Sequence, residues 1–433
     1  MNDFPTPLQL ERRAAHPLRL RGPLLEAALD NVVVGEICEV RGHWRSPQVA
    51  ARAQVIGFQP DAVVLSLLGD GRGLSRASMI VPTGATLRLN CSEALLGSVV
   101  DPQGQIVERL APPSTEAPQA YPVDANPPAY YQRRPVTQAL STGIRVIDGL
   151  LTCGVGQRIG LFASAGSGKT TLINMLISHS DADVFVIGLV GERGREVTEF
   201  IESLRQSPRR AQCVVVFATS DYSSVDRCNS ALLATTIAEY FRDQGRHVLL
   251  LMDSLTRYAR ARRDLALAAG EAPARRGYPA SVFDALPRLL ERPGVTASGS
   301  ITAWYTVLLE SDDEPDPIAE EIRSILDGHL ELSRALAAKG HYPAIDVLRS
   351  VSRVATQVTC AQTQQLAASV RDDLARLEQL QVFLDMGEYT AGVDAANDQA
   401  LQRREALTCW LRQPTAEHCP PDETLRSLDE LFA

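Results

Sequence analysis

The sequence predicts an α/β protein in which a small β-barrel or sandwich precedes a mainly parallel sheet and an α-helical domain follows it. Short β-rich runs broken by Gly, Asp and Pro fill residues 18–110, the pattern of a small barrel or sandwich. Apolar runs alternate with amphipathic helical stretches from 136 to 354, as in βαβ units. After 355, apolar residues recur at helical spacing alone.

These patterns divide the chain into four expected segments. An N-terminal region with the barrel covers 1–110, and its clearest strand-like runs are 32–40, 53–57 and 62–67. Residues 111–135 are rich in Pro and predict a linker. The α/β domain then covers 136–354 and the helical domain 355–433. A length of 433 residues suits about three domains.

Composition excludes several classes of protein. No apolar run approaches the roughly 20 residues of a membrane helix, and the N-terminus lacks the basic and apolar regions of a secretory signal. The net charge of −9 argues against a chain that coats nucleic acid. Eight cysteines form no C-x-x-C pair. The apolar surroundings of Cys153, Cys213 and Cys360 predict buried, reduced thiols of a cytosolic protein, not metal ligands.

The strongest motif is a loop of small residues between an apolar run, 159–163, and a helix that begins at Lys169. Glycines in this loop let backbone N–H groups surround phosphates, and the helix turns its positive end towards them. Lys169 is expected to reach the β- and γ-phosphates, and the Thr170 hydroxyl to ligate Mg²⁺. Ala163 stands where the general motif begins with Gly, but the phosphate-binding part is intact. The predicted nucleotide-binding residues are Ala165, Gly166, Ser167, Gly168, Lys169, Thr170 and Thr171.

Two further apolar strands end in carboxylates. Residues 184–190 lead to Glu192, and 247–252 lead to Asp253. Open α/β sheets bind ligands at the carboxyl ends of their strands, so Glu192 is a candidate base for the attacking water. A solvated turn carboxylate is the alternative. Asp253 is the expected Mg²⁺-side carboxylate, or the N-cap of the helix that follows, or both.

Five stretches resemble the catalytic β subunits of rotary ATPases: 191–196, 253–259, 276–279, 326–329 and 341–346. Four others are similar, more specifically, to the export ATPases of type III secretion systems: 135–148, 234–243, 283–292 and 299–308. Stretches 240–245 and 309–313 favour the injectisome type over the flagellar type. The resemblance is strong from 135 to 353, moderate up to 394 and weak before 93. It implies a RecA-like P-loop core and a Mg²⁺-dependent ATPase.

The resemblance also implies roles for individual residues. Glu192 is the catalytic carboxylate, Asp253 lies on the metal side, and Lys169 and Thr170 bind the phosphates and Mg²⁺. The remaining implied site residues are Arg193 and Arg257 near the phosphates, Tyr342 stacked on adenine, and Arg353 reaching into the neighbouring subunit's site. Because Glu192 and Arg353 belong to one chain, identical copies can complete each other's sites. We therefore expect a homohexamer that is active only when assembled.

The family further implies a cytoplasmic protein, peripherally associated with the inner membrane at the secretion apparatus. Its expected partners are stator or regulator proteins, a central stalk, chaperone–effector complexes and the export gate, with no nucleic acid. The stretch 8–20, with Arg12, Arg13 and Arg19 among apolar neighbours, could favour ring assembly or a membrane surface, or could be a frayed terminus. The loop 219–227 departs from the family pattern, and no role is assigned to it.

Three alternative functions remain at this stage. A rotary ATPase catalytic subunit would need a non-catalytic partner chain. A hexameric RNA translocase would need aromatic side chains on a basic sheet face, whereas residues 18–110 contain only Trp44 and Phe58 as aromatics. A nucleotide-binding regulator that does not hydrolyse ATP is disfavoured by Glu192 and Arg353.

Overall fold

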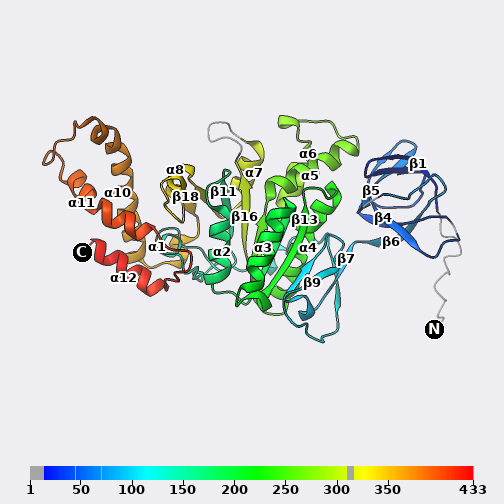
Figure 1. The fold of residues 1–433 in the computed structure, drawn as a ribbon, viewed down its shortest axis with the longest axis horizontal. Helices are drawn as coiled ribbons and strands as arrows, with labels where there is room; N and C mark the ends of the chain where they lie inside the picture. Colours follow the sequence, from blue (N-terminus) through cyan, green and yellow to red (C-terminus); the bar gives the residue numbers. More distant parts are fainter. Residues whose placement is uncertain (1–13, 44, 70, 310–315, 433) are drawn as a thin grey trace.

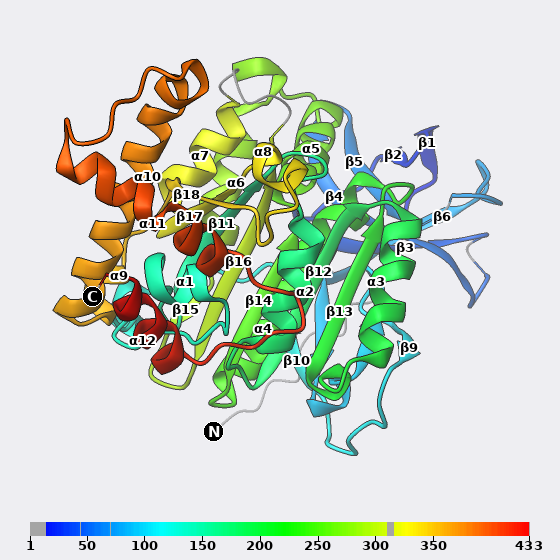
Figure 2. The same ribbon diagram turned by 60° about the vertical axis from the view of Figure 1, so that its left-hand side comes forward.

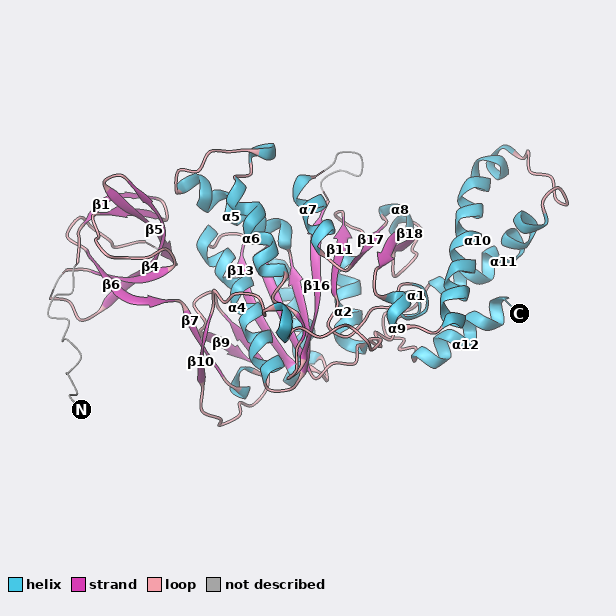
Figure 3. Cartoon of the chain, turned by 180° about the vertical axis from the view of Figure 1, so that it is seen from behind, coloured by secondary structure: helices cyan, strands magenta, loops and turns pink. Residues whose placement is uncertain are grey.

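The computed structural model describes residues 14–43, 45–69, 71–309 and 316–432. Three parts follow one another along the longest axis: a β-barrel, an α/β domain and a group of helices (Figure 1). Strands are confined to the first two parts, and the C-terminal part is helical (Figure 3). The predicted fold class is therefore confirmed. Arg12, Arg13, Trp44 and the stretch 310–313, which the sequence pattern singled out, lie outside the described residues.

The barrel is a six-stranded antiparallel sheet in the order β1-β2-β5-β4-β3-β6. An isolated bridge between Ala15 and Ile80 joins its two edges, so the sheet closes on itself. Side chains that alternate along the strands fill its interior with Leu25, Val40 and Leu65, all at most 1% exposed. The strands are Pro17–Arg21 (β1), Leu24–Ala27 (β2), Glu36–Arg41 (β3), Val49–Gln59 (β4), Ala62–Leu68 (β5) and Met79–Thr86 (β6).

The α/β domain is built on a ten-stranded sheet in the order β18-β17-β11-β16-β14-β12-β13-β8-β9, with β15 paired to β16. Strands β17, β11, β16, β14, β12, β13 and β8 are parallel to one another, so their carboxyl ends share one edge. The strands are Ser98–Val100 (β8), Ile106–Arg109 (β9), Arg158–Ala163 (β11), Val184–Glu192 (β12), Cys213–Thr219 (β13), His247–Asp253 (β14), Gly294–Val295 (β15), Ser300–Leu308 (β16), Gly328–Leu332 (β17) and Ile345–Ser352 (β18).

Helices cover both faces of this sheet, so the central strands are buried on both sides. They are Arg145–Leu150 (α1), Lys169–His179 (α2), Gly194–Gln206 (α3), Ser224–Asp243 (α4), Leu255–Ala268 (α5), Ala280–Leu290 (α6), Pro317–Ile325 (α7) and Arg334–Ala338 (α8). Short 3₁₀ helices are Glu93–Leu95, Tyr130–Gln132, Arg210–Gln212 and Arg275–Gly277.

The C-terminal part contains the helices Ala355–Val358 (α9), Ala361–Met386 (α10), Ala395–Leu411 (α11) and Pro421–Phe432 (α12). Helices α10, α11 and α12 pack on one another and on α1. There Val370, Leu407, Trp410 and Leu428 join the same apolar core as the buried side chains of α2. Each helix in the described part of the chain is too short or too polar to cross a membrane.

Three sequence expectations differ from the structure. Strands β8 and β9 lie within the expected N-terminal region 1–110, yet they extend the central sheet, because β8 pairs in parallel with β13. The expected linker 111–135 contains a strand, Gln119–Pro122 (β10), that pairs with Arg88–Cys91 (β7). Cys153 and Cys213 are buried as expected, but Cys360 is exposed, because it is the residue that precedes α10 at the surface.

One buried carboxylate connects the barrel to the central domain. Asp226, at the start of α4, is fully buried. It accepts hydrogen bonds from the Gly69 N–H after β5 (3.0 Å), the Gln103 amide between β8 and β9 (2.8 Å), and the Ser223 hydroxyl (2.7 Å). Three segments far apart in the sequence therefore meet at this one side chain.

Candidate active site

The phosphate loop is formed as the sequence predicts. Strand β11 ends at Ala163, and α2 begins at Lys169. Gly166 and Gly168 have φ of +80° and +88°, which residues with a side chain rarely adopt. A Cβ at Gly168 would also lie 2.9 Å from the Tyr342 ring. The loop therefore presents backbone N–H groups and a helix N-terminus to the same space, which suits phosphate.

Three charged side chains meet beside this loop. Lys169 Nζ lies 2.6 Å from Asp253 Oδ1 and 3.5 Å from Glu192 Oε1. Both carboxylates are buried, with Glu192 3% and Asp253 8% exposed. The cluster forms because β11, β14 and β12 are parallel and end at the same edge of the sheet. Lys169, Glu192 and Asp253, three of the candidate residues, therefore lie together beside the phosphate loop.

Glu192 is buried, and two positively charged side chains contact its carboxylate. Arg257 Nη2 lies 3.2 Å from Oε2, and its Nη1 donates to the Gly191 carbonyl. Burial, followed by repulsion from Asp253, raises the pKa of Glu192, while Lys169 and Arg257 oppose the shift. Neither carboxylate oxygen accepts a hydrogen bond from a residue that the structure describes. A buried acceptor of this kind suits a water molecule, which is the group that a catalytic base must hold.

Asp253 is anchored within the sheet. Its Oδ1 accepts a hydrogen bond of 2.7 Å from the Thr306 hydroxyl on β16, a residue absent from the predicted site. The alternative that Asp253 caps the following helix is wrong. Ser254 caps α5 instead, because its hydroxyl accepts from the Arg257 N–H.

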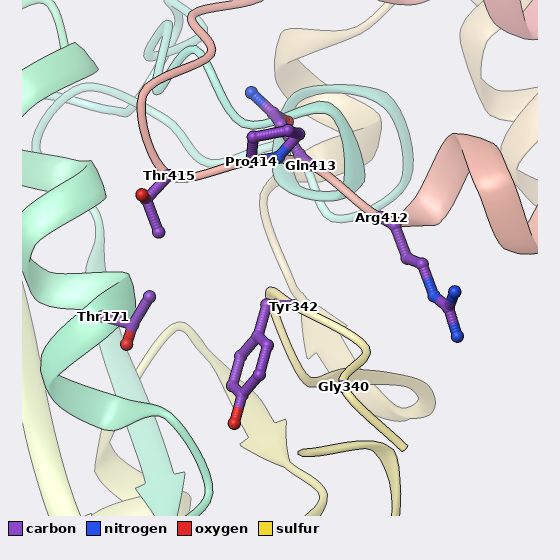
Figure 4. A pocket seen from close by; sticks show the side chains of 7 residues that line it. All are labelled: Thr171, Gly340, Tyr342, Arg412, Gln413, Pro414 and Thr415. Carbon is purple, nitrogen blue, oxygen red and sulfur yellow. The ribbon is translucent and has the colours of Figure 1, made fainter. Parts of the chain in front are cut away.

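A pocket of about 490 Å³ adjoins the phosphate loop. Thr171 on α2 and the Tyr342 ring lie on one side of it, and the connection between α11 and α12 lies on the other (Figure 4). Its lining residues are Thr171, Gly340, Tyr342, Arg412, Gln413, Pro414 and Thr415. A flat aromatic ring beside the phosphate loop suits a stacked nucleobase. Tyr342 was predicted from the sequence, whereas residues 412–415 were not, because they follow a helix and carry no motif of their own.

Gln413 holds in place the side of the pocket formed by residues 412–415, here called the wall. It is 2% exposed, and its N–H donates to the Tyr342 carbonyl at 2.9 Å. Its side-chain amide donates to the Gly143 and Glu417 carbonyls at 2.8 and 2.7 Å and accepts from the Arg145 N–H at 2.8 Å. One glutamine therefore joins the helical part of the chain to the edge of the pocket.

Two predicted site residues do not join the cluster within one chain. The Arg193 side chain is 78% exposed, and it pairs with Glu196 on the surface of α3 at 3.8 Å. Arg353 lies beyond the end of β18, where its N–H donates to the Asp327 carbonyl and its guanidinium to the Leu326 carbonyl. Neither arginine is therefore placed at the phosphate loop of its own chain.

Sheet topology explains the position of Arg353. β17 runs parallel to β11, and β18 runs antiparallel to β17, so β18 leads away from the phosphate-loop edge. Asp327, next to Arg353, donates its N–H to the carbonyl of Arg158, the first residue of β11. The phosphate loop follows Ala163 at the other end of β11. At about 3.3 Å per residue, the five steps between them put roughly 17 Å between the two ends.

The residues present fit Mg²⁺-ATP. Mg²⁺ is usually bound by one or two protein oxygens, together with water and substrate phosphates. Two oxygens of this kind lie at the phosphate loop. One belongs to the Asp253 carboxylate and the other to the hydroxyl of Thr170 in the first turn of α2. The described residues contain no group of three or more His, Cys, Asp or Glu that could hold a metal by themselves. A metal at this site would therefore depend on the nucleotide.

Comparison with known proteins identifies the family. The nucleotide-binding domain of the ATP synthase alpha/beta family matches residues 143–352, and the β-barrel domain of that family matches 19–84. The T3SS EscN ATPase C-terminal domain matches 359–430. A SPI-1 type 3 secretion system ATPase of Salmonella typhi is 59% identical over 415 residues, which are 96% of each chain. The chain belongs to the type III secretion system ATPases.

Other relatives support this family. A type 3 secretion system ATPase of Xanthomonas euvesicatoria is 47% identical, over 97% of this chain and 94% of the relative. The structure of the assembled ATPase EscN from enteropathogenic E. coli superposes with a TM-score of 0.89 at 41% identity, covering 97% of this chain and 100% of EscN. A flagellum-specific ATP synthase of Treponema pallidum is 43% identical, over 96% of this chain and 92% of the relative. The 59% identity to a SPI-1 protein favours the injectisome type, as predicted.

Proposed function

We propose that this ATPase hydrolyses Mg²⁺-ATP in a ring of six identical copies, and that the ring energises chaperone release, unfolding and export of proteins through a type III secretion apparatus. The observation that carries the proposal is the separation of Glu192 from Arg353. One chain holds both residues, but at opposite edges of its sheet. In a ring, the Arg353 of one copy can reach the phosphate loop of the neighbouring copy, although it cannot reach the phosphate loop of its own chain.

Each residue of the cluster has a distinct task. The backbone of 165–168 and Lys169 hold the phosphates, which draws the Lys169 ammonium away from Asp253. Thr170 and Asp253 would hold Mg²⁺, which would supply positive charge to offset the charge of the triphosphate. Glu192 holds the attacking water and accepts its proton, a role for which a raised pKa is suited. Arg257 keeps Glu192 in place from the other side.

Arg353 acts as the arginine that completes the site from the adjacent copy. Such an arginine contributes about 10³ to 10⁵ in turnover, so the monomer should be nearly inactive. The family resemblance assigns Arg193 to the phosphates, although its side chain is exposed at the surface of a single chain. Tyr342 stacks on adenine in the pocket beside α2. A structure of EscN with its central stalk EscO supports an assembly built around a stalk.

The same relationship supports the remaining partners. We propose stator or regulator proteins, chaperone–effector complexes and the export gate as partners, with the ATPase peripheral to the inner membrane.

Two of the alternative functions, the rotary ATPase subunit and the RNA translocase, now lack support. The match of 359–430 to a C-terminal domain specific to secretion ATPases separates the chain from rotary subunits. Phe58 is 53% exposed, but no second aromatic accompanies it on the described part of the barrel.

ATP turnover should be measured against protein concentration for wild type, Glu192→Gln and Arg353→Ala, with oligomer size followed by light scattering. We expect turnover per chain to rise with assembly, to vanish in both variants, and to return in part when the two are mixed. Arg195→Ala is the matched control, because Arg195 is 85% exposed and pairs with Glu199 one turn further along the same helix. Turnover independent of concentration, or an active Arg353→Ala, would show that each chain holds a complete site.

A further inference from the structure

Thr306 is buried between the two strands that carry the phosphate loop and Asp253. It lies near the end of β16, which is hydrogen-bonded to β11 on one side and to β14 on the other, and it is 2% exposed. Its hydroxyl lies 2.7 Å from Asp253 Oδ1 and 3.2 Å from the Met252 carbonyl. A hydroxyl has one proton to donate, and a charged acceptor at the shorter distance makes the stronger bond. The Thr306 hydroxyl therefore donates its hydrogen bond to Asp253 and not to the Met252 carbonyl.

Lys169 and Thr306 donate to the same oxygen of Asp253. Lys169 Nζ is 2.6 Å from Oδ1 and also 3.5 Å from Glu192, so the ammonium is shared between two carboxylates. When Lys169 turns to the phosphates, Asp253 loses that contact. The Thr306 hydroxyl does not have to move, because it is fixed by the backbone of a central strand.

We infer that Thr306 is a positioning residue that keeps the Asp253 carboxylate oriented for Mg²⁺ after Lys169 has left it. The inference rests on the proposed metal-side role of Asp253 and deepens it. Hydrogen bonds to a metal-side carboxylate set its orientation, and removing such a partner typically weakens metal affinity by about 10- to 100-fold. A threonine that only fills space would make no such difference.

Substitution of Thr306 by Val removes the hydroxyl and keeps the shape of the side chain. For Thr306→Val we expect the free Mg²⁺ concentration that half-saturates ATP hydrolysis to rise by roughly tenfold. At saturating Mg²⁺, KM for ATP should change by less than about twofold, because the phosphate loop and Tyr342 are untouched. A shift confined to the Mg²⁺ dependence is the signature of a role exerted through Asp253.

A second readout does not need turnover. Binding of a fluorescent ATP analogue is measured in EDTA and then across a Mg²⁺ titration. In EDTA the affinity of Thr306→Val should equal that of wild type, and the Mg²⁺ needed for tight binding should rise by the same roughly tenfold factor as in hydrolysis.

Two variants serve as controls, and melting temperatures are recorded for all of them. Thr306→Ser keeps the hydroxyl, so it should restore the wild-type Mg²⁺ dependence. Thr235→Val removes an equally buried hydroxyl that donates to the Ala231 carbonyl within α4, so it should leave that dependence unchanged. Should Thr306→Val not fold, Thr306→Ala takes its place. A wild-type Mg²⁺ dependence in Thr306→Val, or a Ser variant as impaired as Val, would overturn the inference.

Asp253→Asn separates this inference from the proposal beneath it. If Asp253→Asn leaves the Mg²⁺ dependence of nucleotide binding unchanged, the metal-side role of Asp253 is wrong, and the inference falls with it. If Asp253→Asn abolishes that dependence while Thr306→Val behaves as wild type, the role of Thr306 alone is wrong.

Discussion

Among single residues, Glu192 shows the conflict between stability and chemistry most clearly. A buried carboxylate is costly when charged, and the charge of Asp253 nearby increases that cost. Lys169 and Arg257 offset only part of it. The result is a carboxyl whose pKa is raised, and this makes it a better proton acceptor than a solvated glutamate.

This raised pKa predicts the pH dependence of the enzyme. Protonated Glu192 cannot accept a proton from water, so kcat/KM for ATP should rise with pH through the pKa of Glu192 and level off above it. The midpoint should lie above the usual range of a glutamate. Substitution of Arg257 by Gln removes a charge that lowers this pKa, so it should move the midpoint to higher pH.

A pH series of initial rates on assembled enzyme tests this expectation. Glu199→Gln is the matched control, because Glu199 is 62% exposed on α3 and its charge is screened by water. A midpoint in the range of an ordinary glutamate, or an Arg257→Gln profile shifted to lower pH, would contradict the assignment.

The connection between α11 and α12 shows how an element from one part of the chain completes a site in another. It runs past α2 (Figure 2), and its residues 412–415 face Tyr342 across the pocket. Arg145 of α1 holds it as well, through the Trp410 and Arg412 carbonyls and an ion pair with Glu417. His179, at the end of α2, contacts the Thr415 carbonyl at 2.9 Å. A shift of the helical part would therefore change the shape of the pocket.

Gln413→Leu should loosen this wall. The change removes the side-chain contacts with Gly143, Glu417 and the Arg145 N–H. Without these three contacts the wall can shift away from the pocket, so we expect KM for ATP to rise about tenfold, equivalent to about 1.4 kcal/mol of binding free energy, with little change in kcat. Steady-state kinetics measures both. Gln381→Leu, an exposed change on α10, should leave KM as it is; equal KM values for all three proteins would show that the wall does not contribute to binding.

For the whole molecule, the decisive contact is the one that connects the barrel to the catalytic domain. Asp226 accepts from Gly69, Gln103 and Ser223, and Ile37 and Leu68 of the barrel pack into the central core beside it. Burial raises the pKa of Asp226, so its charge is maintained at a cost that these donors offset. Such a junction holds the barrel against α4.

Asp226→Ala should weaken the junction. The Gly69 N–H and the Gln103 amide lose a charged acceptor, and a hydrogen bond to a charged group contributes about 1.5 to 3 kcal/mol. We expect a lower melting temperature and faster amide hydrogen exchange in the barrel strands than in β12 and β14. Asp61→Ala, an exposed change in the turn between β4 and β5, is the control. Unchanged exchange in the barrel would show that apolar packing alone holds it.

The sequence by itself determined the order of the three parts and the centre of the site. The phosphate loop is a local signal, because its glycines, Lys169 and the helix that follows lie within a few residues of one another. Glu192 and Asp253 were predictable for a related reason. Each ends an apolar strand, and parallel strands present their carboxyl ends at one edge of the sheet.

The tertiary structure alone decided which distant residues complete that site. Thr306 reaches Asp253 only through the pairing of β16 with β14, and residues 412–415 reach Tyr342 only because the C-terminal helices pack on α1. The register of β17 and β18 places Arg353 at the far edge of the sheet. Likewise β8 and β9 extend the central sheet, although their sequence resembles that of the barrel strands. Such contacts depend on register and packing, and neither is encoded in a local pattern.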